Sequence, residues 1–493
     1  MLLSHLPALQ VVVPLLAAPL CALLRPRHLA WAVATLTSWV CLLISLTLVA
    51  QVQAGGTLRY TFGGWPSPWG IEYVVDLLGA YVLLIVSLIA ALVLPYARRS
   101  VEREIDPEHH SLFYTALLLC LCGLLGIVIT GDAFNLFVFL EISSLSTYTL
   151  ISFGRDRRAL TASYQYLIMG TIGATFFLIG VGLLYVLTGT LNMADLAERI
   201  VPLAESRTLH TAFAFILVGV SLKLALFPLH LWLPNAYAHA PSVVSAFIAS
   251  TATKVAVYVV VRFIFSLFGY RFAFDQMQLD WVLLPLAIIG IFTASVVAVF
   301  QENVKRMLAY SSLAQIGYMM LGISLDSVTG LTASLLHLFN HALMKGALFM
   351  ALGAVFYRIG SVQLGQMAGL GRQMPWTLGA VVAGGLSLIG VPLTVGFISK
   401  WYLILAVIEQ GWWILAALVL VTSLIALVYM WRVVETSYFQ PRPAGAVIAG
   451  EAPLSLIAPT WLLVLANLYF GIDTGFTIDL AGSAAAALIG GEP

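Results

Sequence analysis

Charged residues are scarce in this sequence. Asp, Glu, Lys and Arg make up 9% of the 493 residues, and hydrophobic residues make up 61%. Soluble proteins carry roughly 25% charged residues. Apolar stretches of about twenty residues, the length needed to cross a bilayer as a helix, follow one another along almost the whole chain. The composition therefore excludes a nucleic-acid-binding protein and predicts an all-α polytopic membrane protein without a separate soluble domain.

Cysteine is also rare, and the motifs of redox and nucleotide cofactors are missing. The four cysteines, Cys21, Cys41, Cys120 and Cys122, lack the spacing of iron–sulfur ligands, and no glycine-rich phosphate motif occurs. A Cys-x-Cys pair on a helix directs its side chains to different faces, so we interpret these residues as small apolar filling. The sequence predicts no cofactor, no metal site and no redox chemistry of its own.

Apolar windows predict about fourteen transmembrane helices. They lie near residues 5–24, 29–50, 74–96, 112–130, 133–153, 162–187, 209–233, 241–265, 281–300, 307–325, 329–357, 376–408, 411–432 and 453–471. The first window ends in Arg25-Pro26-Arg27 without a small-residue cleavage site, so it is expected to be a first span and not a removable signal peptide.

Positive charge is distributed unevenly between the loops, although the net charge is only +1. Loops after odd-numbered spans hold fourteen Lys and Arg residues, and loops after even-numbered spans hold five. The first group is Arg25, Arg27, Arg98, Arg99, Arg103, Arg155, Arg157, Arg158, Lys305, Arg306, Arg358, Arg372, Arg432 and Arg442; the second is Arg59, Arg199, Arg207, Arg262 and Arg271. Short cytoplasmic loops retain Lys and Arg, so both termini are expected on the outer side of a bacterial cytoplasmic membrane.

Five ionisable residues fall inside the predicted spans. They are Glu141, Lys223, Lys254, Lys345 and Lys400. A charged side chain at the bilayer centre costs roughly 2.5 to 3.5 kcal/mol, so such residues are candidates for function. A single lysine near a helix end could instead place its amine in the water at the membrane surface, but four lysines with one glutamate are harder to explain in that way.

A single glutamate among four lysines predicts one ion pair. We expect Glu141 to pair with Lys223, which leaves the other lysines without an acidic partner. An amine buried without a counter-ion can exist in its neutral form. Such an amine can take up and release a proton, so the sequence indicates proton transfer.

Histidines extend this pattern. His337, His341 and Lys345 are spaced by four residues, so they lie along one helix face over roughly 12 Å. This spacing favours a proton relay over a bis-histidine haem site, which needs histidines from facing helices. His230 and His239 could link the path to one surface, or each could be a structural residue.

Two prolines interrupt predicted spans beside a lysine. Pro228 follows Lys223 by five residues, and Pro392 precedes Lys400 by eight. Each proline removes a backbone hydrogen bond. Interrupted helices at matching places in two halves indicate an inverted repeat with an ion site near the midplane.

Six segments resemble the antiporter-like family shared by Mrp-type multisubunit cation/proton antiporters and the membrane arm of respiratory complex I. They are "FNLFVFLEISSLS", "KLALFPLHLWLPNAYAHAPSVVSA", "STATKVAVY", "NVKRMLAYSSLAQIGYM", "LFNHALMKGALFM" and "VPLTVGFISKW". The terminal lysine, Lys400, resembles both the D-type member of Mrp antiporters and the N-type member of complex I. The segment "LTGTLNMADLAE" and a length near 490 residues resemble the Mrp D-type member most, with the M-type and N-type members of complex I as related types.

The resemblance implies two five-helix units of inverted topology. Helices 1–3 would occupy residues 1–111, the first unit (helices 4–8) residues 112–266, the second (helices 9–13) residues 281–432, and helix 14 with its tail residues 453–493. Helices 7 and 12 would be the broken ones.

The resemblance also implies a role for each buried group. Glu141 and Lys223 would form the ion pair of the first half-channel, and Lys254 would be the central lysine. His337, His341 and Lys345 would form the interior relay, and Lys400 the terminal titratable group.

These observations predict a proton-translocating subunit of a multisubunit monovalent-cation (Na⁺)/H⁺ antiporter. One alternative is a proton-pumping subunit of a complex I-type, membrane-bound hydrogenase or inorganic-carbon uptake complex, where it would count as part of a translocase. Another is a scaffold subunit that conducts nothing. Each of these functions implies other membrane subunits as partners and no nucleic acid. The transported ions would be protons and, in an antiporter, sodium.

Overall fold

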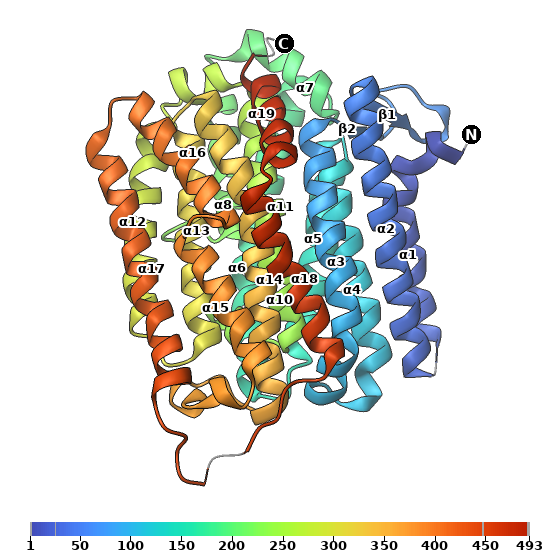
Figure 1. Cartoon of the computed structure of the whole chain (residues 1–493). Helices are drawn as coiled ribbons and strands as arrows, with labels where there is room; N and C mark the ends of the chain where they lie inside the picture. Colours follow the sequence, from blue (N-terminus) through green and yellow to red (C-terminus); the bar gives the residue numbers. More distant parts are fainter. Residues whose placement is uncertain (1, 25, 446–447, 491–493) are drawn as a thin grey trace.

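A computed structural model describes residues 2–24, 26–445 and 448–490. Arg25, counted above among the loop arginines, and the last three residues of the predicted tail lie outside the described residues. Long helices stand side by side and cross the molecule from end to end (Figure 1). Both termini lie at the same end of the bundle, as an even number of crossings requires.

The helices follow the order of the predicted spans. The first part of the chain forms α1 (Leu6–Leu23), α2 (Arg27–Gly55), α3 (Leu77–Glu104), α4 (His110–Ile129), α5 (Ala133–Ser152), α6 (Arg157–Thr188), α8 (Arg207–Leu224), α9 (Trp232–His239), α10 (Ser242–Ser250) and α11 (Ala252–Val261). The second part forms α12 (Asp280–Val299), α13 (Val304–Ser324), α14 (Val328–Ile359), α15 (Pro375–Ile389), α16 (Val395–Glu409), α17 (Trp413–Phe439), α18 (Leu454–Ile472) and α19 (Gly475–Gly490).

Shorter elements connect them. The 3₁₀-helices are η1 (Leu2–His5), η2 (Phe62–Gly64), η3 (Pro107–His109), η4 (Val201–Leu203), η7 (Leu364–Met367) and η8 (Leu370–Arg372), and the π-helices are η5 (Arg262–Leu267) and η6 (Phe272–Gln276). An amphipathic helix, α7 (Met193–Ile200), lies in the loop before α8.

The prediction of an all-helical membrane fold is confirmed. Twelve helices of the described chain are long and apolar enough to cross a membrane. Two further crossings lie outside this set, because α13 contains Gln315, two tyrosines and three serines among its apolar residues and because α15 and α16 are short. With α13 and the α15–α16 pair, the described residues make the fourteen crossings that the sequence predicts. The inverted relation between residues 112–266 and 281–432 stays a prediction.

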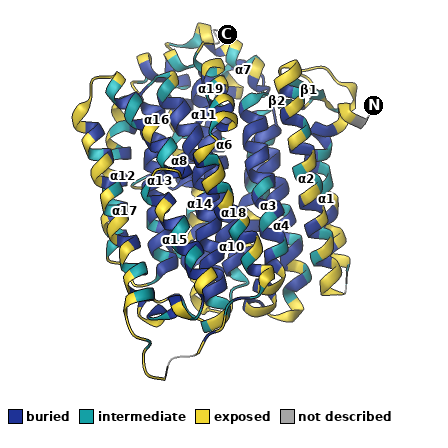
Figure 2. Ribbon diagram, viewed as in Figure 1, coloured by how far each residue is buried: buried dark blue, intermediate teal, exposed yellow. Residues whose placement is uncertain are grey.

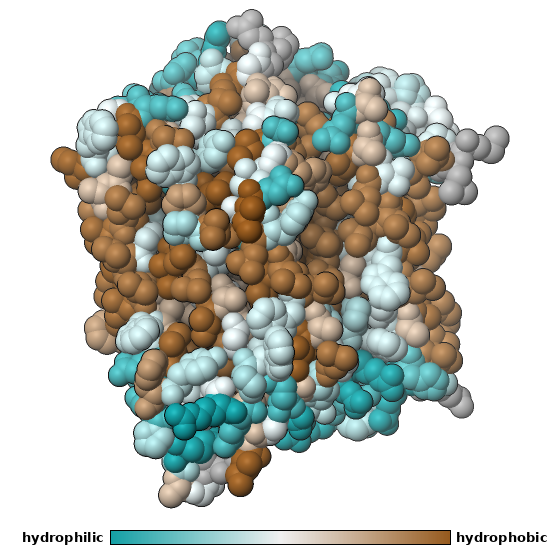
Figure 3. All heavy atoms as spheres, in the orientation of Figure 1, coloured by the Kyte–Doolittle hydropathy of each residue, from teal (hydrophilic) through white to brown (hydrophobic). Residues whose placement is uncertain are grey.

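Helix α14 forms the centre of the bundle. Every residue from Gly330 to Val355 is buried, and α14 packs against α3, α10, α13, α15, α16, α18 and α19. Buried residues concentrate in the central helices, whereas α1, α2, α12 and α17 expose one face (Figure 2). Apolar side chains form a broad band around the middle of the molecule, with hydrophilic side chains toward its ends (Figure 3). The band matches a helix bundle whose outer surface faces lipid.

Two predicted spans are interrupted at the prolines. α8 ends at Leu224, Ala225 adopts a left-handed conformation (φ 61°), and the helix resumes as α9 at Trp232. α15 ends at Ile389, Gly390 has φ 93°, and α16 begins at Val395. Pro228 and Pro392 lie in these gaps.

Three features of the fold were not predicted from the sequence. The predicted loop between helices 2 and 3 contains an antiparallel hairpin of β1 (Leu58–Thr61) and β2 (Glu72–Val75), because four-residue strands are too short for apolar windows to detect. The predicted span 8 is interrupted at Thr251 (φ −125°, ψ −58°), where no proline marks the break. The described tail after α18 is helical and packs against α3 and α14.

Candidate functional site

Glu141 and Lys223 form an ion pair between α5 and the end of α8. The Lys223 Nζ lies 3.3 Å from the Glu141 Oε1, and it also donates a hydrogen bond to the Ser144 Oγ at 2.6 Å. Lys223 is one residue from the point where α8 stops. The ammonium therefore lies at a helix C-terminus, whose partial negative charge favours a cation.

Lys254 is fully buried and makes its main hydrogen bond to the protein backbone. Its Nζ donates to the carbonyl oxygen of Ala249 and lies 3.4 Å from the Thr253 Oγ1. The interruption at Thr251 leaves carbonyl oxygens of α10 without their helical partners, so they can accept from the amine. Among the described residues, Lys254 forms no ion pair.

The side chains of His337, His341 and Lys345 lie along one face of α14, as their spacing predicts. The rings of the two histidines stack with their centroids 6.0 Å apart. The His337 Nδ1 lies 2.8 Å from the Ser399 Oγ of α16. The Lys345 Nζ donates to the carbonyl oxygen of Leu308 at 2.9 Å and to the hydroxyl of Ser311, both on α13.

Lys400 is held at the break between α15 and α16. Its Nζ donates to the carbonyl oxygens of Leu388 and Ile389 at 3.1 and 2.9 Å and to the Ser423 Oγ of α17 at 3.0 Å. Because the helix stops at Gly390, these two carbonyls have no helical N–H partner and can accept from the amine. A broken helix again supplies the acceptors for a buried amine.

Tyr318 of α13 joins Lys400 to the histidines. The Lys400 Nζ lies 5.2 Å from the centre of the Tyr318 ring, and the ring centroids of Tyr318 and His337 are 5.8 Å apart. The Tyr318 hydroxyl is 2.6 Å from the Thr422 Oγ1. Lys400, Tyr318, His337 and His341 therefore form a row across three helices.

Several polar atoms of this row, and one of Gln315 on the same helix as Tyr318, have no hydrogen-bond partner among the described residues. They are the His337 Nε2, both ring nitrogens of His341 and the Gln315 Oε1, and all are buried. Buried polar groups are nearly always hydrogen-bonded, and an internal water is the usual partner where the protein supplies none. The unpaired atoms thus indicate where waters would bridge the row.

The remaining predicted residues, His230 and His239, lie near the two ends of α9. His230 is in the gap after α8, and its ring stacks against Phe227 with the centroids 5.3 Å apart. Its Nδ1 is buried and has no hydrogen-bond partner among the described groups. The His239 Nδ1 lies 3.9 Å from the Asp156 Oδ2, in the loop between α5 and α6. Neither histidine contacts the Glu141–Lys223 pair among the interactions that the structure describes.

The hydroxyl groups that surround the charges were not predicted from the sequence. Ser144, Ser311, Ser399, Ser423 and Tyr318 each contact a predicted lysine or histidine. A signal existed for four of them, because Ser144, Ser311, Ser399 and Tyr318 lie in the six segments that carry the family resemblance. In the described parts of the chain, no three His, Cys, Asp or Glu side chains come together as a metal site would require.

Comparison with known proteins gives consistent matches. Residues 130–426 match the family described as "NADH:quinone oxidoreductase/Mrp antiporter, TM". The N subunit of NADH-quinone oxidoreductase from Desulforudis audaxviator is 42% identical over 489 residues, which cover 95% of this chain and 96% of that protein. The D subunit of the Na⁺/H⁺ antiporter from Alkalihalophilus pseudofirmus is 32% identical over 392 residues, covering 80% and 78%. A chain of the Mrp complex from Dietzia sp. superposes with a TM-score of 0.90 at 28% identity, covering 99% and 98%.

Proposed function

We propose a transport function for this chain, which belongs to the family of antiporter-like membrane subunits shared by NADH:quinone oxidoreductases and Mrp antiporters. It would translocate protons within a complex I-type membrane assembly. A quinone-reducing partner would supply the energy, as in an NADH-quinone oxidoreductase, whose N subunit is 42% identical to this chain. The sequence motifs favour the D-type member of an Mrp antiporter instead. The identity of 42% to an N-type relative, against 32% to a D-type relative, supports the complex I-type alternative better.

The observation that carries the proposal is the buried row of amines and imidazoles. Lys254 interacts electrostatically with Lys345, and both interact with His341. His341 stacks on His337, which contacts Tyr318 beside Lys400. Each amine of this row is held by hydroxyls or carbonyls and not by a carboxylate, so a proton can be passed on without breaking an ion pair.

The Glu141–Lys223 pair would control this row through its electric field. A unit charge at about 4 Å is worth about 4 kcal/mol at an effective dielectric constant of about 20. Opening the pair would expose the Lys223 charge to its neighbours, and an energy of this size suffices to change the protonation state of a nearby lysine. Proton movement would then be coupled to events in adjacent subunits through the pair.

The assembly can be identified directly. Native mass spectrometry of the complex purified with this chain should find hydrophilic dehydrogenase subunits beside other membrane subunits. Finding only small membrane subunits would overturn the complex I-type assignment and favour a monovalent-cation/H⁺ antiporter. The Mrp antiporter is the second candidate because the fold superposes on a chain of an Mrp complex over nearly its full length.

Transport is tested with Glu141→Gln in the assembled complex. We expect proton translocation into sealed vesicles to fall several-fold at normal expression, with Glu141→Asp retaining more activity because it keeps the charge. A scaffold subunit predicts the opposite, namely unchanged transport even when Lys223, Lys254 and Lys400 are neutralised together.

We also propose that the chain lies in a bacterial cytoplasmic membrane with both termini on the outer side.

A further inference from the structure

A second, partly buried ion pair links the end of α11 to the start of α3. The Arg262 guanidinium binds Asp76 through two hydrogen bonds, with its Nη1 2.6 Å from the Oδ2 and its Nη2 2.7 Å from the Oδ1. Asp76 also accepts a hydrogen bond from the Gly79 N–H and so caps α3. The pair lies outside the row of Lys400, Tyr318 and the histidines.

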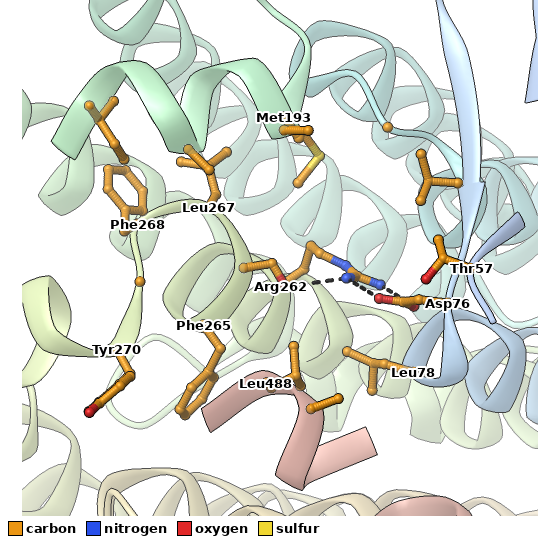
Figure 4. Close-up of a pocket in the computed structure, with 18 of the residues that line it drawn as sticks. Thr57, Asp76, Leu78, Met193, Arg262, Phe265, Leu267, Phe268, Tyr270 and Leu488 are labelled. Atoms are coloured by element: carbon orange, nitrogen blue, oxygen red, sulfur yellow. Dashed lines mark hydrogen bonds and ion pairs between the residues drawn. The ribbon is translucent and has the colours of Figure 1, made fainter. Parts of the chain in front are cut away.

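This pair forms part of the wall of a large cavity. The cavity has a volume of about 880 Å³ and lies at the end of the bundle where both termini are found, between α3, α7, α19, the hairpin and the π-helices η5 and η6 (Figures 1 and 4). Its wall contains a second ion pair, Arg59 with Glu72 at 3.0 Å. Charged groups facing a purely apolar filling would be costly, so the two pairs favour water in at least part of the cavity.

Helix α11 and its continuation η5 connect the cavity to the central lysine. Lys254, Tyr258 and Arg262 are spaced by four residues and lie on one helix face, which rises roughly 12 Å from Lys254 to Arg262. The Arg262 Nε donates to the Tyr258 hydroxyl oxygen at 3.1 Å, and that hydroxyl donates to the carbonyl oxygen of Val128 at 2.7 Å. Both Tyr258 and Arg262 border the cavity.

The backbone changes form where this face reaches the cavity. Residues Arg262–Leu267 form a π-helix, and a second π-helix, Phe272–Gln276, follows beyond Gly269. Such widened turns are rare and are found often at functional sites. Residues of both segments line the cavity.

We propose that Lys254, Tyr258, Arg262 and Asp76 form a gated proton route from the central lysine to this cavity, with the Asp76–Arg262 ion pair as the gate. The route rests on the proton transport proposed above. It is closed in the structure, because the Lys254 amine is turned toward Ala249 and the Asp76 carboxylate is occupied by Arg262.

The proton balance of the route is simple. The Lys254 ammonium loses one proton and becomes the neutral amine. The Tyr258 oxygen accepts that proton, directly or through one water, and the hydroxyl releases its own proton to the Asp76 carboxylate once the ion pair opens. Asp76 then releases the proton to water in the cavity. Arg262 keeps its charge throughout, as an arginine in a protein does.

Water access is tested with a single introduced thiol. The four native cysteines are buried, so a Ser266→Cys variant would carry the accessible thiol beside Arg262. A charged, membrane-impermeant thiol reagent applied from the side of the termini should label this variant about tenfold faster than Ser250→Cys, whose site is buried. Labelling of Ser266→Cys only by an apolar reagent would mean a lipid-filled cavity and would overturn the route.

The gate is tested in the assembled complex with Asp76→Asn, which keeps the helix cap and removes the charge. We expect proton translocation per turnover of the driving reaction to fall several-fold, with the matched variant Asp195→Asn, at a surface ion pair on α7, unchanged. The double variant Asp76→Asn/Arg262→Gln should leak protons without the driving reaction.

The outcomes separate this proposal from the general function. If both Asp76 variants move protons as the wild type does while Lys254→Met abolishes transport, the route is wrong and the proposed function stands. If Lys254→Met also transports normally, the proposed function itself fails. Should the Asp76→Asn complex not assemble, the labelling of Ser266→Cys decides alone.

Discussion

The imidazole rings of His337 and His341 lie 6.0 Å apart and within 12° of parallel, on successive turns of α14. Within the part of the chain that the structure describes, only one of their four ring nitrogens, the His337 Nδ1, has a protein partner. A buried imidazole without partners is costly for a folded protein. Its presence at the centre of the bundle is therefore explained better by proton transfer through bridging water than by a structural role.

Replacing His341 should separate stability from transport. His341→Leu removes two buried polar atoms that no described protein group satisfies, so the midpoint of thermal unfolding should stay equal or rise, by the equivalent of about 1 kcal/mol. Proton translocation should fall at least several-fold. A matched change at His337, His337→Leu, should lower stability as well, because it leaves the Ser399 hydroxyl without its partner. A lower unfolding midpoint for His341→Leu than for the wild type would contradict this interpretation.

The amine of Lys400 should be needed in its present place. Lys400→Met removes the amine but keeps a similar length, so proton translocation should be lost while the complex still assembles. Ser423→Ala removes one of the three acceptors around the amine and should lower the rate only modestly. Equal losses in the two variants would indicate that Ser423 acts directly in the transfer, contrary to a row that runs from Lys400 through Tyr318.

Gly396 allows the close approach of the two halves of the broken helix α15–α16. A Cβ at Gly396 would collide with the main-chain carbonyl of Ser387. Gly396→Ala should therefore push the two halves apart and destabilise the protein by about 1 to 3 kcal/mol. The control is Gly365→Ala, where a Cβ would meet no atom within 4 Å. Thermal unfolding of both variants checks the prediction, and equal midpoints would refute it.

The Asp76–Arg262 pair should stabilise the protein above acidic pH. Burial alone would raise the pKa of Asp76, but the Arg262 guanidinium and the Gly79 N–H outweigh it and hold this pKa below its ordinary value. A depressed pKa means that the unfolded state binds more protons in the window between the two values, so stability rises with pH there. The difference in unfolding midpoint between wild type and Asp76→Asn should be constant at neutral pH and shrink below about pH 4.

Asp132 offers a control, because its pKa is shifted in the opposite direction to that of Asp76. Burial raises the pKa of this carboxyl at the start of α5, and the hydrogen bonds from backbone N–H groups offset only part of the effect. Its ionised form therefore costs stability at neutral pH, and the cost disappears as the pH falls. Asp132→Asn should gain stability relative to wild type at neutral pH. If the unfolding midpoints of Asp76→Asn and Asp132→Asn, each relative to wild type, changed in the same direction with pH, both assignments would be contradicted.

The sequence predicts the buried charges well because their cost in a membrane makes each one conspicuous. Lys254 and Lys400 stand out inside apolar windows, and their positions at the core of the bundle follow. Arg262 shows the limit of this reasoning. It lies near the end of a window and is predicted to be a loop charge, whereas the structure places it in the π-helix η5, paired with Asp76 at the start of α3. A partner 186 residues away in the chain leaves no local trace.

Other features depend on signals that are weak in any single sequence. The break at Thr251 has no proline or glycine, so propensity gives no warning of it. Strand β1 of the hairpin alternates between half-buried and exposed residues, but β2 does not, and the two strands have only four residues each. In the sequence, Tyr318 resembles the many other aromatic residues of apolar helices. Its position between Lys400 and His337 is seen only in the structure.

The interrupted helices have a consequence for how this protein can be dissected. Lys254 and Lys400 both rest on main-chain oxygens, at Ala249 and at Leu388 and Ile389. A peptide oxygen belongs to no residue type, so alanine scanning is blind to these acceptors, and related sequences can exchange the surrounding side chains without losing them. Replacing single amide bonds by esters, which weakens the carbonyl as an acceptor, is the kind of chemistry that could reach them.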